Sequence, residues 1–398
     1  MAQRFNKKYQ PTPGVFMHLL RVQVPDFRGL KNIDITFEKD FVPSIFPLGS
    51  QNGGGKSTLL QLIFVLLHCS VDEDKKPFIA NMLQGFKVAD GEEKRVLALI
   101  DIWDGEKIVK LEFSCKDFSF IEGTAPIEHE LEYEYKHPNP ENIVICYVEK
   151  SRKEILYNIT EITIIVLNCH VNNQKKEQAK LFLNKVSRKV FLAAPSTQVF
   201  LFLPPEERKL LFRNSSNGDN YYGILESARS KLQGLFTYDF LAVELLIESF
   251  KAARDRDFQE AIKTGNYGNS YQALIKELNL LLGNKRINLD EDFSGVNFQL
   301  DNNGETIELY PEDLSHGELK RLSIYIWLKS RNIKDAIVLM DEVEIAFHPD
   351  WQYQIISDLK EWAPSNQYIL ATHSYALCEA LTPAHVKEIE PKLIKQKS

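Results

Sequence analysis

The sequence predicts an α/β protein. Two observations carry this prediction. Apolar segments of strand length end in polar residues near Leu48, at 335–342 and at 366–374, and open α/β sheets bind ligands at the carboxyl ends of their strands. A glycine-rich loop, GSQNGGGKST at 49–58, joins the first of these strands to an apolar run of helical length, as phosphate-binding loops do.

Composition indicates a soluble globular protein. The 398 residues are 44% hydrophobic and 26% charged, which allows about two to three domains at roughly 150 residues each. The net charge is -7, so a global positive field for nucleic acid is excluded and DNA would need a local patch. The candidate patches, which are more often solvated helix faces, are Lys185, Arg188 and Lys189, and Lys251, Arg254 and Arg256.

The chain carries no sign of secretion or membrane insertion. Its N-terminus lacks an apolar signal region, and the longest apolar run, from Leu59, is too short to cross a bilayer. The five cysteines form no CxxC pair, which favours reduced thiols over a zinc site or a disulfide framework. We expect a cytoplasmic protein without a membrane partner.

The first 200 residues predict an α/β unit around the glycine-rich loop and a β-rich arm. Residues 16–41 alternate as two adjacent strands around a turn at 27–29, and Pro43 and Pro47 make the next strand short or place it at an edge. A buried helix follows Lys56. Short strands then dominate 87–170, before a helix at 172–189 and a return to strand at 189–207.

The rest of the chain predicts a helical lobe and a second α/β unit. Apolar spacings of three and four make 205–285 helical. Residues 296–310 form a hairpin around Asn302, Asn303 and Gly304, and helices beginning near 313 and 348 alternate with the strands at 335–342 and 366–374. We therefore divide the chain into 1–200, 201–300 and 301–398.

The loop at 49–58 has the parts of a P-loop. Glycines let backbone N–H groups converge on phosphate oxygens, the Lys56 ammonium reaches the terminal phosphates, and the Ser57 hydroxyl ligates Mg²⁺. The strict pattern has glycine at position 50, where this chain has serine, which fits if its backbone is ordinary. The predicted ATP-binding residues are Ser50, Asn52, Gly53, Gly54, Gly55, Lys56, Ser57 and Thr58.

Two further strand ends supply groups suited to phosphoryl transfer. DAIVLMDE at 335–342 ends in Asp341, placed to hold Mg²⁺ together with Ser57, and Glu342, placed to polarise the attacking water. His373, in LATHSY, can contact a γ-phosphate. A capping or core histidine is the alternative for that position.

The order of P-loop, LSHGEL at 314–319, acidic strand and strand-end histidine resembles that of ATP-binding-cassette ATPases. The runs at 19–37, with its DFRG turn, and at 341–352 (DEVEIAFHPDWQ), and the final ATHS, resemble the RecF, SMC and OLD-type branch and its relatives in bacterial defence. This resemblance implies an ABC/RecF-like head with an inserted lobe. It covers about 1–60 and 305–398 and leaves the middle unplaced.

The resemblance also implies a head-to-tail pair in which each signature helix faces the partner's γ-phosphate. The residues contributed in trans would be Ser315, His316, Gly317 and Glu318. A helix N-terminus is a suitable anion site. His316 stands where the family has a small residue, and either contacts the partner's phosphates or, as we favour, points away. The nucleotide-sensing glutamine implied by the family would be Gln198, with a surface glutamine as the equal alternative.

These observations predict an ATPase that uses ATP and Mg²⁺ and couples hydrolysis to closing of the pair. No nuclease constellation is recognisable, and the chain continues only to Ser398 after His373. We therefore expect an ATPase subunit of an anti-phage system that acts with a separate nuclease chain. The alternatives are a RecF-like repair ATPase that binds duplex DNA, a transport motor, and an ATP-gated scaffold without hydrolysis.

Overall fold

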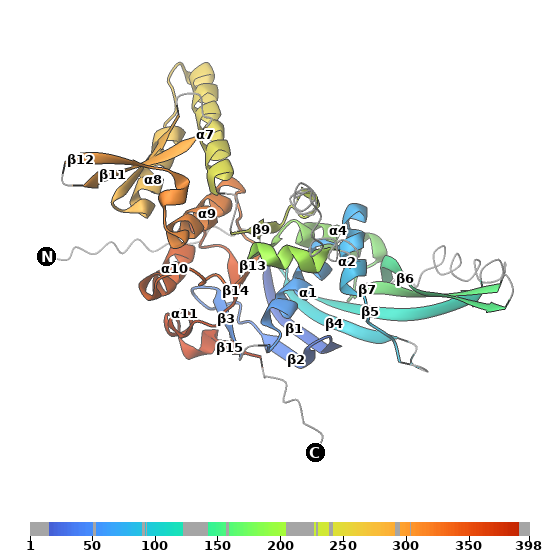
Figure 1. The fold of residues 1–398 in the computed structure, drawn as a ribbon. Coiled ribbons are helices and arrows are strands. Elements are labelled where there is room, and N and C mark those ends of the chain that lie inside the picture. The colour runs from blue at the N-terminus through green and yellow to red at the C-terminus, as the bar shows by residue number, and fades with distance from the viewer. Residues whose placement is uncertain are drawn as a thin grey trace.

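The computed structural model places two six-stranded sheets on either side of one helix, with a separate lobe and a long arm (Figure 1). It describes residues 16–50, 53–89, 92, 94–121, 142–156, 159–203, 227, 230–238, 242–290, 295–302 and 304–389.

The first sheet is antiparallel, in the order β2-β1-β4-β5-β7-β6. Its strands are β1 (His18–Phe27), β2 (Leu30–Thr36), β4 (Arg95–Trp103), β5 (Ile108–Ile121), β6 (Asn142–Leu156) and β7 (Ile159–Val171). The predicted pair of strands around 27–29 is confirmed, with Arg28 in the left-handed conformation at the turn (φ 50°). The strands β5, β6 and β7 are longer than predicted and project as the arm (Figure 1).

The second sheet is entirely parallel, in the order β15-β3-β14-β13-β8-β9. Its strands are β3 (Ile45–Gly49), β8 (Val190–Ala194), β9 (Leu235–Thr237), β13 (Ile337–Asp341), β14 (Gln367–Ala371) and β15 (Lys387–Glu388). Strand β3 is short, as expected, but it lies inside the sheet. The predicted strand at 189–207 is wrong at 195–202, because Pro195 is followed by the 3-10 helix η2 (Ser196–Phe202), and 204–207 lie outside the described residues.

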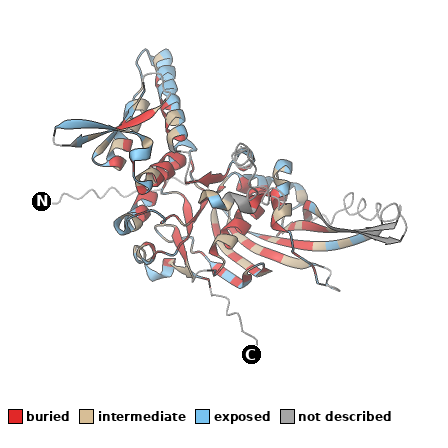
Figure 2. Ribbon diagram, viewed as in Figure 1, coloured by how far each residue is buried: buried red, intermediate tan, exposed pale blue. Residues whose placement is uncertain are grey.

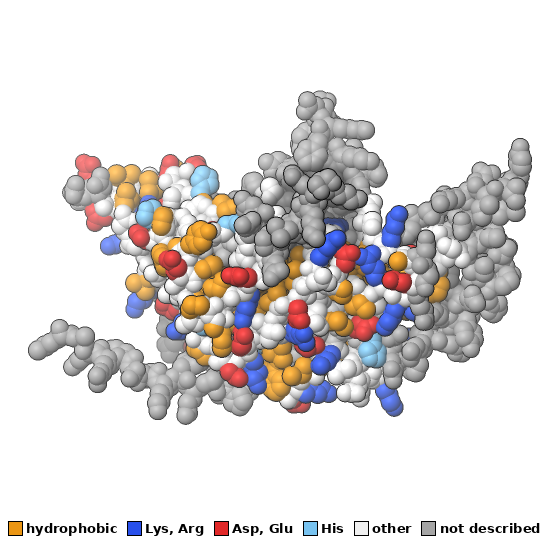
Figure 3. Space-filling view, turned by 90° about the horizontal axis from the view of Figure 1, so that it is seen from below, with side chains coloured by type: hydrophobic (Ala, Val, Ile, Leu, Met, Phe, Trp, Pro, Cys, Tyr) orange, Lys and Arg blue, Asp and Glu red, His pale blue; other side chains and the backbone are white. Residues whose placement is uncertain are grey.

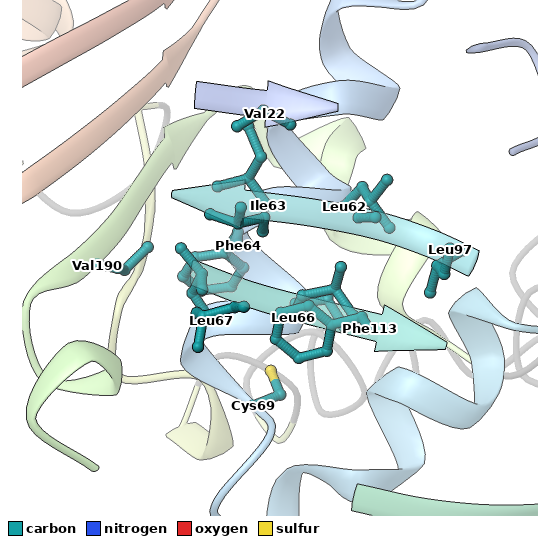
Figure 4. Packing of buried hydrophobic residues seen from close by; sticks show 14 of the residues in the cluster. Val22, Leu62, Ile63, Phe64, Leu66, Leu67, Cys69, Leu97, Phe113 and Val190 are labelled. Atoms are coloured by element: carbon teal, nitrogen blue, oxygen red, sulfur yellow. The ribbon is translucent and has the colours of Figure 1, made fainter. Parts of the chain in front are cut away.

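Helix α1 (Lys56–His68) lies between the two sheets, as Figure 4 shows. Its side chains Ile63, Phe64 and Leu66 belong to one core with Phe113 of the antiparallel sheet and Val190 of the parallel sheet. A helix covered on both sides must be apolar all round, which explains the run LLQLIFVLLHC. The predicted buried helix is confirmed.

A side chain also joins the two sheets directly. Gln367, on β14, is fully buried. Its amide oxygen accepts from the Leu19 N–H at 2.7 Å, and its amide nitrogen donates to the Leu19 carbonyl at 2.9 Å. The pairing of β1 with β4 shifts register next to Leu19. Gln367 therefore satisfies backbone groups that the strand ladder leaves open.

The separate lobe contains helices and a small sheet (Figure 1). Its elements are α7 (Ala242–Thr264), α8 (Ser270–Leu282), β10 (Lys285–Leu289), β11 (Val296–Asn302) and β12 (Glu305–Leu309). The predicted hairpin at 296–310 is confirmed; Asn303 lies outside the described residues. The expectation that 205–285 is wholly helical is wrong, because β9 interrupts it. The lobe packs on α9 (His316–Ser330) through Phe250, Leu278 and Phe298.

The remaining elements complete the head. They are η1 (Glu73–Lys75), α2 (Lys76–Met82), α4 (Lys176–Ser187), η3 (Pro311–Asp313), α10 (Pro349–Trp362), α11 (Tyr375–Glu379) and η4 (Pro383–His385). The predicted helices at 172–189 and from 348 are confirmed by α4 and α10. Figure 2 shows that α9 is largely buried, whereas the outer part of α7 is exposed.

The surface shown in Figure 3 mixes acidic and basic side chains over its described part. Ion pairs among the described residues include Arg21–Asp34 and Lys387–Glu38. Within the described residues, no helix has the length and apolar character needed to cross a bilayer.

The end of α1 is held by a buried histidine. His68 accepts from the Gly234 N–H (3.3 Å) and from the Lys75 ammonium (3.2 Å) at Nε2, and its Nδ1–H donates to the Ser187 carbonyl at 2.7 Å. These bonds require the neutral ring. Burial lowers the pKa of His68 to about 4, and the Lys75 charge acts in the same direction.

This histidine predicts a loss of stability in mild acid. Between pH about 6.5 and about 4, the unfolded chain binds a proton at His68 that the folded chain excludes, so the free energy of unfolding falls as pH falls. At roughly 1.4 kcal/mol per pKa unit, the loss approaches about 3 kcal/mol. Denaturant unfolding at several pH values should show a shallower pH dependence for His68→Gln than for wild type. His316→Gln, at an exposed position, should keep the wild-type dependence, and equal slopes in all three proteins would refute the assignment.

Candidate nucleotide site

Four neighbouring strands of the parallel sheet end at one edge, and each is followed by predicted site residues. β3 leads into the P-loop, β14 into His373, β13 into Glu342 and β8 into the turn containing Gln198. Because all four strands are parallel, their carboxyl ends meet at the same edge. The fold thus brings together residues that are more than 300 positions apart, as between Lys56 and His373.

The P-loop owes its shape to glycine at two positions. Gly53 and Gly55 have left-handed backbones (φ 79° and 90°). The φ of Gly55 would strain any other residue before α1, and a Cβ atom there would also displace Leu30 Cδ2, which it would approach to 2.6 Å. Ser50 is not among the residues with positive φ, so serine replaces glycine there without strain. Gly54 is buried, Thr58 is half-buried in α1, and Asn52 lies outside the described residues.

The Lys56 ammonium occupies the centre of the site. It is 5% exposed and donates to the Ser50 carbonyl (3.0 Å) and hydroxyl (3.1 Å). Its Nζ also lies 3.3 Å from His373 Nδ1, which must accept because an ammonium only donates. Burial lowers the pKa of Lys56, and the carboxylates of Glu344, Asp341 and Glu342 oppose this shift. These three hydrogen bonds are the ones that phosphate oxygens would replace.

Ser57 and Asp341 are already in contact. The Ser57 hydroxyl donates to Asp341 Oδ1 at 3.0 Å, and Asp341 is 2% exposed. Burial raises the pKa of Asp341 to about 7; the Ser57 hydrogen bond opposes this effect, and the nearby Glu342 and Glu344 add to it. A hydroxyl and a carboxylate are oxygen ligands suited to Mg²⁺, which is usually held by one or two carboxylates and substrate phosphates. The pair therefore fits the predicted metal site.

Glu342 is held in a left-handed backbone conformation (φ 50°). Its N–H donates to the Ala371 carbonyl at 2.9 Å. Its carbonyl accepts from the Lys320 ammonium at 2.9 Å, and the same ammonium donates to the Ile345 carbonyl at 3.1 Å. This conformation is costly for a non-glycine residue. The surrounding hydrogen bonds stabilise it and thereby fix the position from which the Glu342 side chain leaves the backbone.

The signature segment forms the N-terminus of α9. Ser315 is the N-cap, and its hydroxyl accepts from the Glu318 N–H at 3.2 Å. The Glu318 carboxylate accepts from the Ser315 N–H at 2.9 Å and pairs with Lys285. Ser315 and His316 are exposed, whereas Gly317 is buried. The exposed helix start is thus available to a neighbouring molecule.

Gly317 has a packing role that the sequence analysis missed. A Cβ atom there would lie 2.8 Å from the Ala346 carbonyl oxygen and 3.2 Å from Trp351 Cζ3. Glycine at this position therefore allows α9 to approach the loop that follows Glu342.

Gln198 lies beside α1. Its side-chain oxygen accepts from the amide of Gln61, which is buried one turn after Ser57 on the same helix. The turn after β8 therefore reaches the nucleotide helix, and Gln61 is a partner that the motifs did not reveal.

Lys320 and Glu344 were also missed. Glu344 lies inside the run DEVEIAFHPDWQ and Lys320 directly follows LSHGEL, but only the fold shows what they contact. Lys320 links α9 to the loop after Glu342. The Glu344 carboxylate accepts from the His373 N–H at 2.7 Å.

Comparison with known proteins supports the predicted resemblance to P-loop ATPases. Residues 214–379 match a family model described as "AAA domain, putative AbiEii toxin, Type IV TA system". The match includes the signature, Glu342 and His373, but begins after the P-loop. A 54-residue stretch is 40% identical to a "Retron Vc95 probable ATPase" of Vibrio cholerae serotype O1 biovar El Tor. That stretch is 14% of this chain and spans only 10% of the relative's length.

Solved structures of SMC heads are also similar. The Smc head domain from Pyrococcus furiosus, bound to the C-terminal domain of ScpA, aligns over 92% of both chains with 16% identity and a TM-score of 0.42. The SMC head domain from Thermotoga maritima aligns over 91% of both chains with 11% identity and a TM-score of 0.38.

The tight contact at Gly317 predicts a measurable loss of stability on substitution. Alanine is favoured over glycine in a helix by about 1 kcal/mol. In Gly317→Ala, however, the added methyl would press on the backbone at Ala346, and overpacking of this kind costs about 1 to 3 kcal/mol. We expect denaturant unfolding to show net destabilisation for Gly317→Ala. His316→Ala, in the same turn but exposed, should change stability by no more than about 0.5 kcal/mol. Wild-type stability in Gly317→Ala would contradict the packing role.

Proposed function

We propose that this protein binds and hydrolyses ATP in composite sites formed by two copies arranged head to tail. We further propose that it is the ATPase subunit of an anti-phage defence system and acts with a separate nuclease chain. The observation that carries the ATPase proposal is the meeting of Lys56, Ser57, Asp341, Glu342 and His373 at one sheet edge.

The residues of this edge divide the work of phosphoryl transfer to water. The glycines and the first turn of α1 offer backbone N–H groups to the phosphates. Lys56 exchanges its bonds to Ser50 for phosphate oxygens and compensates their charge. His373, which accepts from Lys56 before nucleotide binds, is placed to contact the terminal phosphate.

Two carboxylates take different roles. Asp341 and Ser57 would hold Mg²⁺, which neutralises the phosphate charge that develops during transfer. Glu342 is only half-buried, and its carboxylate polarises the attacking water as a general base. Its backbone is fixed by Ala371 and Lys320, so the base is oriented before substrate arrives.

Contact between α9 and the loop after Glu342 supports the composite arrangement. The exposed start of α9, at Ser315 and His316, offers a helix N-terminus to a phosphate of a second copy. The same helix touches the catalytic loop through Gly317 and Lys320. A partner's phosphate bound at the signature would thus act on an element that holds Glu342.

The defence role rests on resemblance. The matched family model is described with a toxin and a type IV toxin–antitoxin system, and the matched relative is a retron ATPase. These matches, together with the resemblance to OLD-type ATPases, favour this role over a transport motor.

Mixing of inactive variants tests the composite sites. Lys56→Ala should abolish ATP binding. Glu342→Gln should bind ATP, but its turnover should be at least about 100-fold lower than that of wild type. Ser315→Arg should block the partner's site. A one-to-one mixture of Lys56→Ala and Ser315→Arg should recover about a quarter of wild-type turnover, because half the pairs are mixed and each mixed pair has one intact site.

The matched control combines Lys56→Ala with Glu342→Gln. Both changes disable the half-site that binds nucleotide, so each mixed pair has no intact site and no recovery is expected. Recovery in this control, or none in the first mixture, would refute the head-to-tail arrangement. Wild-type turnover by Glu342→Gln would refute its role as the base.

The nuclease is expected to be a separate chain. Purified protein incubated with linear and supercoiled DNA, ATP and Mg²⁺ should leave both substrates uncut, as gel electrophoresis would show. DNA cleavage that copurifies with the protein but is lost in Lys56→Ala would overturn this division of labour. Salt-dependent, ATP-stimulated DNA binding without a nuclease partner would instead favour a RecF-like repair role.

A further inference from the structure

Glu344 is a buried carboxylate of the nucleotide site that has no role in the mechanism above. It is 8% exposed and follows Glu342 by two positions. One oxygen, Oε1, accepts from the backbone N–H of His373 at 2.7 Å. The other, Oε2, is buried and has no hydrogen-bond partner among the described residues.

The surroundings of this carboxylate place it against the catalytic groups. Burial lowers the pKa of Lys56, and Glu344 is the carboxylate that opposes this shift most, ahead of Asp341 and Glu342. Its charge also helps to raise the pKa of Asp341. Glu344 therefore lies close to both the phosphate-binding ammonium and the metal-binding carboxylate.

A buried carboxylate oxygen without a donor is costly. Lys56 does not supply the donor, because its three N–H groups are directed to the Ser50 carbonyl, the Ser50 hydroxyl and His373. Phosphate oxygens only accept. A donor of the right kind can arrive with the nucleotide, because Mg²⁺ enters protein sites with several of its water molecules retained.

We propose that Glu344 is a positioning residue with two functions: Oε1 fixes the backbone of His373, and Oε2 accepts a hydrogen bond from a water molecule of the magnesium ion bound with ATP. This inference rests on the proposed function. It makes Glu344 the link between the loop of Glu342 and the loop of His373.

The test compares nucleotide binding with and without the cation, and does not depend on turnover. A fluorescent ATP analogue is titrated into wild type and Glu344→Gln, once in Mg²⁺ and once in EDTA. Glutamine keeps an oxygen for the His373 N–H but presents an amide nitrogen where Oε2 stood. The magnesium gain, the ratio of the affinity in Mg²⁺ to the affinity in EDTA, should be about 10-fold or more lower in Glu344→Gln than in wild type. A loss of this size is usual when a residue that hydrogen-bonds to a metal ligand is removed.

Binding in EDTA should behave differently. Because one negative charge is removed near the triphosphate, the affinity of Glu344→Gln should stay within about threefold of wild type or rise. A purely structural role would instead lower affinity equally in both conditions. Equal losses, or an unchanged magnesium gain, would overturn the proposal.

Asp358→Asn is the matched control. Asp358 is 3% exposed and pairs with Arg321 away from the P-loop. This variant should lower the melting temperature while the magnesium gain stays at the wild-type value.

If Glu344→Gln does not fold, a second variant tests the same proposal. Glu344→Asp keeps the charge but is too short to reach His373 and a hydrated cation together. Its magnesium gain should fall at least about threefold, and no change would overturn the proposal. Absence of analogue binding by the wild type would overturn the proposed function itself, and this inference with it.

Discussion

The burial of α1 between two sheets is the constraint on which the rest of the structure depends. A helix that is apolar all round has no stable place at a surface, so both sheets must cover it. One end of this helix is fixed by His68, and the other begins at Lys56 in the P-loop. Because the parallel sheet packs on the same helix, its strand ends are brought to the P-loop. The packing that buries α1 in the core therefore also positions the residues at the strand ends.

Negative charge gathers at that site. The carboxylates of Glu344, Asp341 and Glu342 all oppose the lowering of the Lys56 pKa by burial. Burial raises the pKa of Asp341 to about 7, and the charges of Glu342 and Glu344 add to this shift. If the site takes ATP and Mg²⁺ as proposed, these carboxylates would disfavour the nucleotide without its cation.

Where short spacing decides it, the sequence predicts which helix or strand end carries each candidate residue. Lys56 and Ser57 open a helix after a strand, and Asp341 and Glu342 close a buried strand, so local pattern is sufficient. Elsewhere the deciding contact joins distant positions. The glycine at 317 serves a contact with Ala346 and Trp351, and Glu344 meets His373 only because β13 and β14 are neighbours. No local pattern contains that information.

The fold prediction has the same limit. The apolar run at 199–203 has the composition of a strand, but Pro195 and the following 3-10 helix end β8 early. Strand β9 has only three residues, too few for any periodicity.

The arm has a further consequence because of Gln367. Strands β4 to β7 continue the antiparallel sheet from β1, and the Gln367 side chain hydrogen-bonds the backbone of β1 to β14. The sheet that carries the arm is thus hydrogen-bonded directly to the strand that precedes His373.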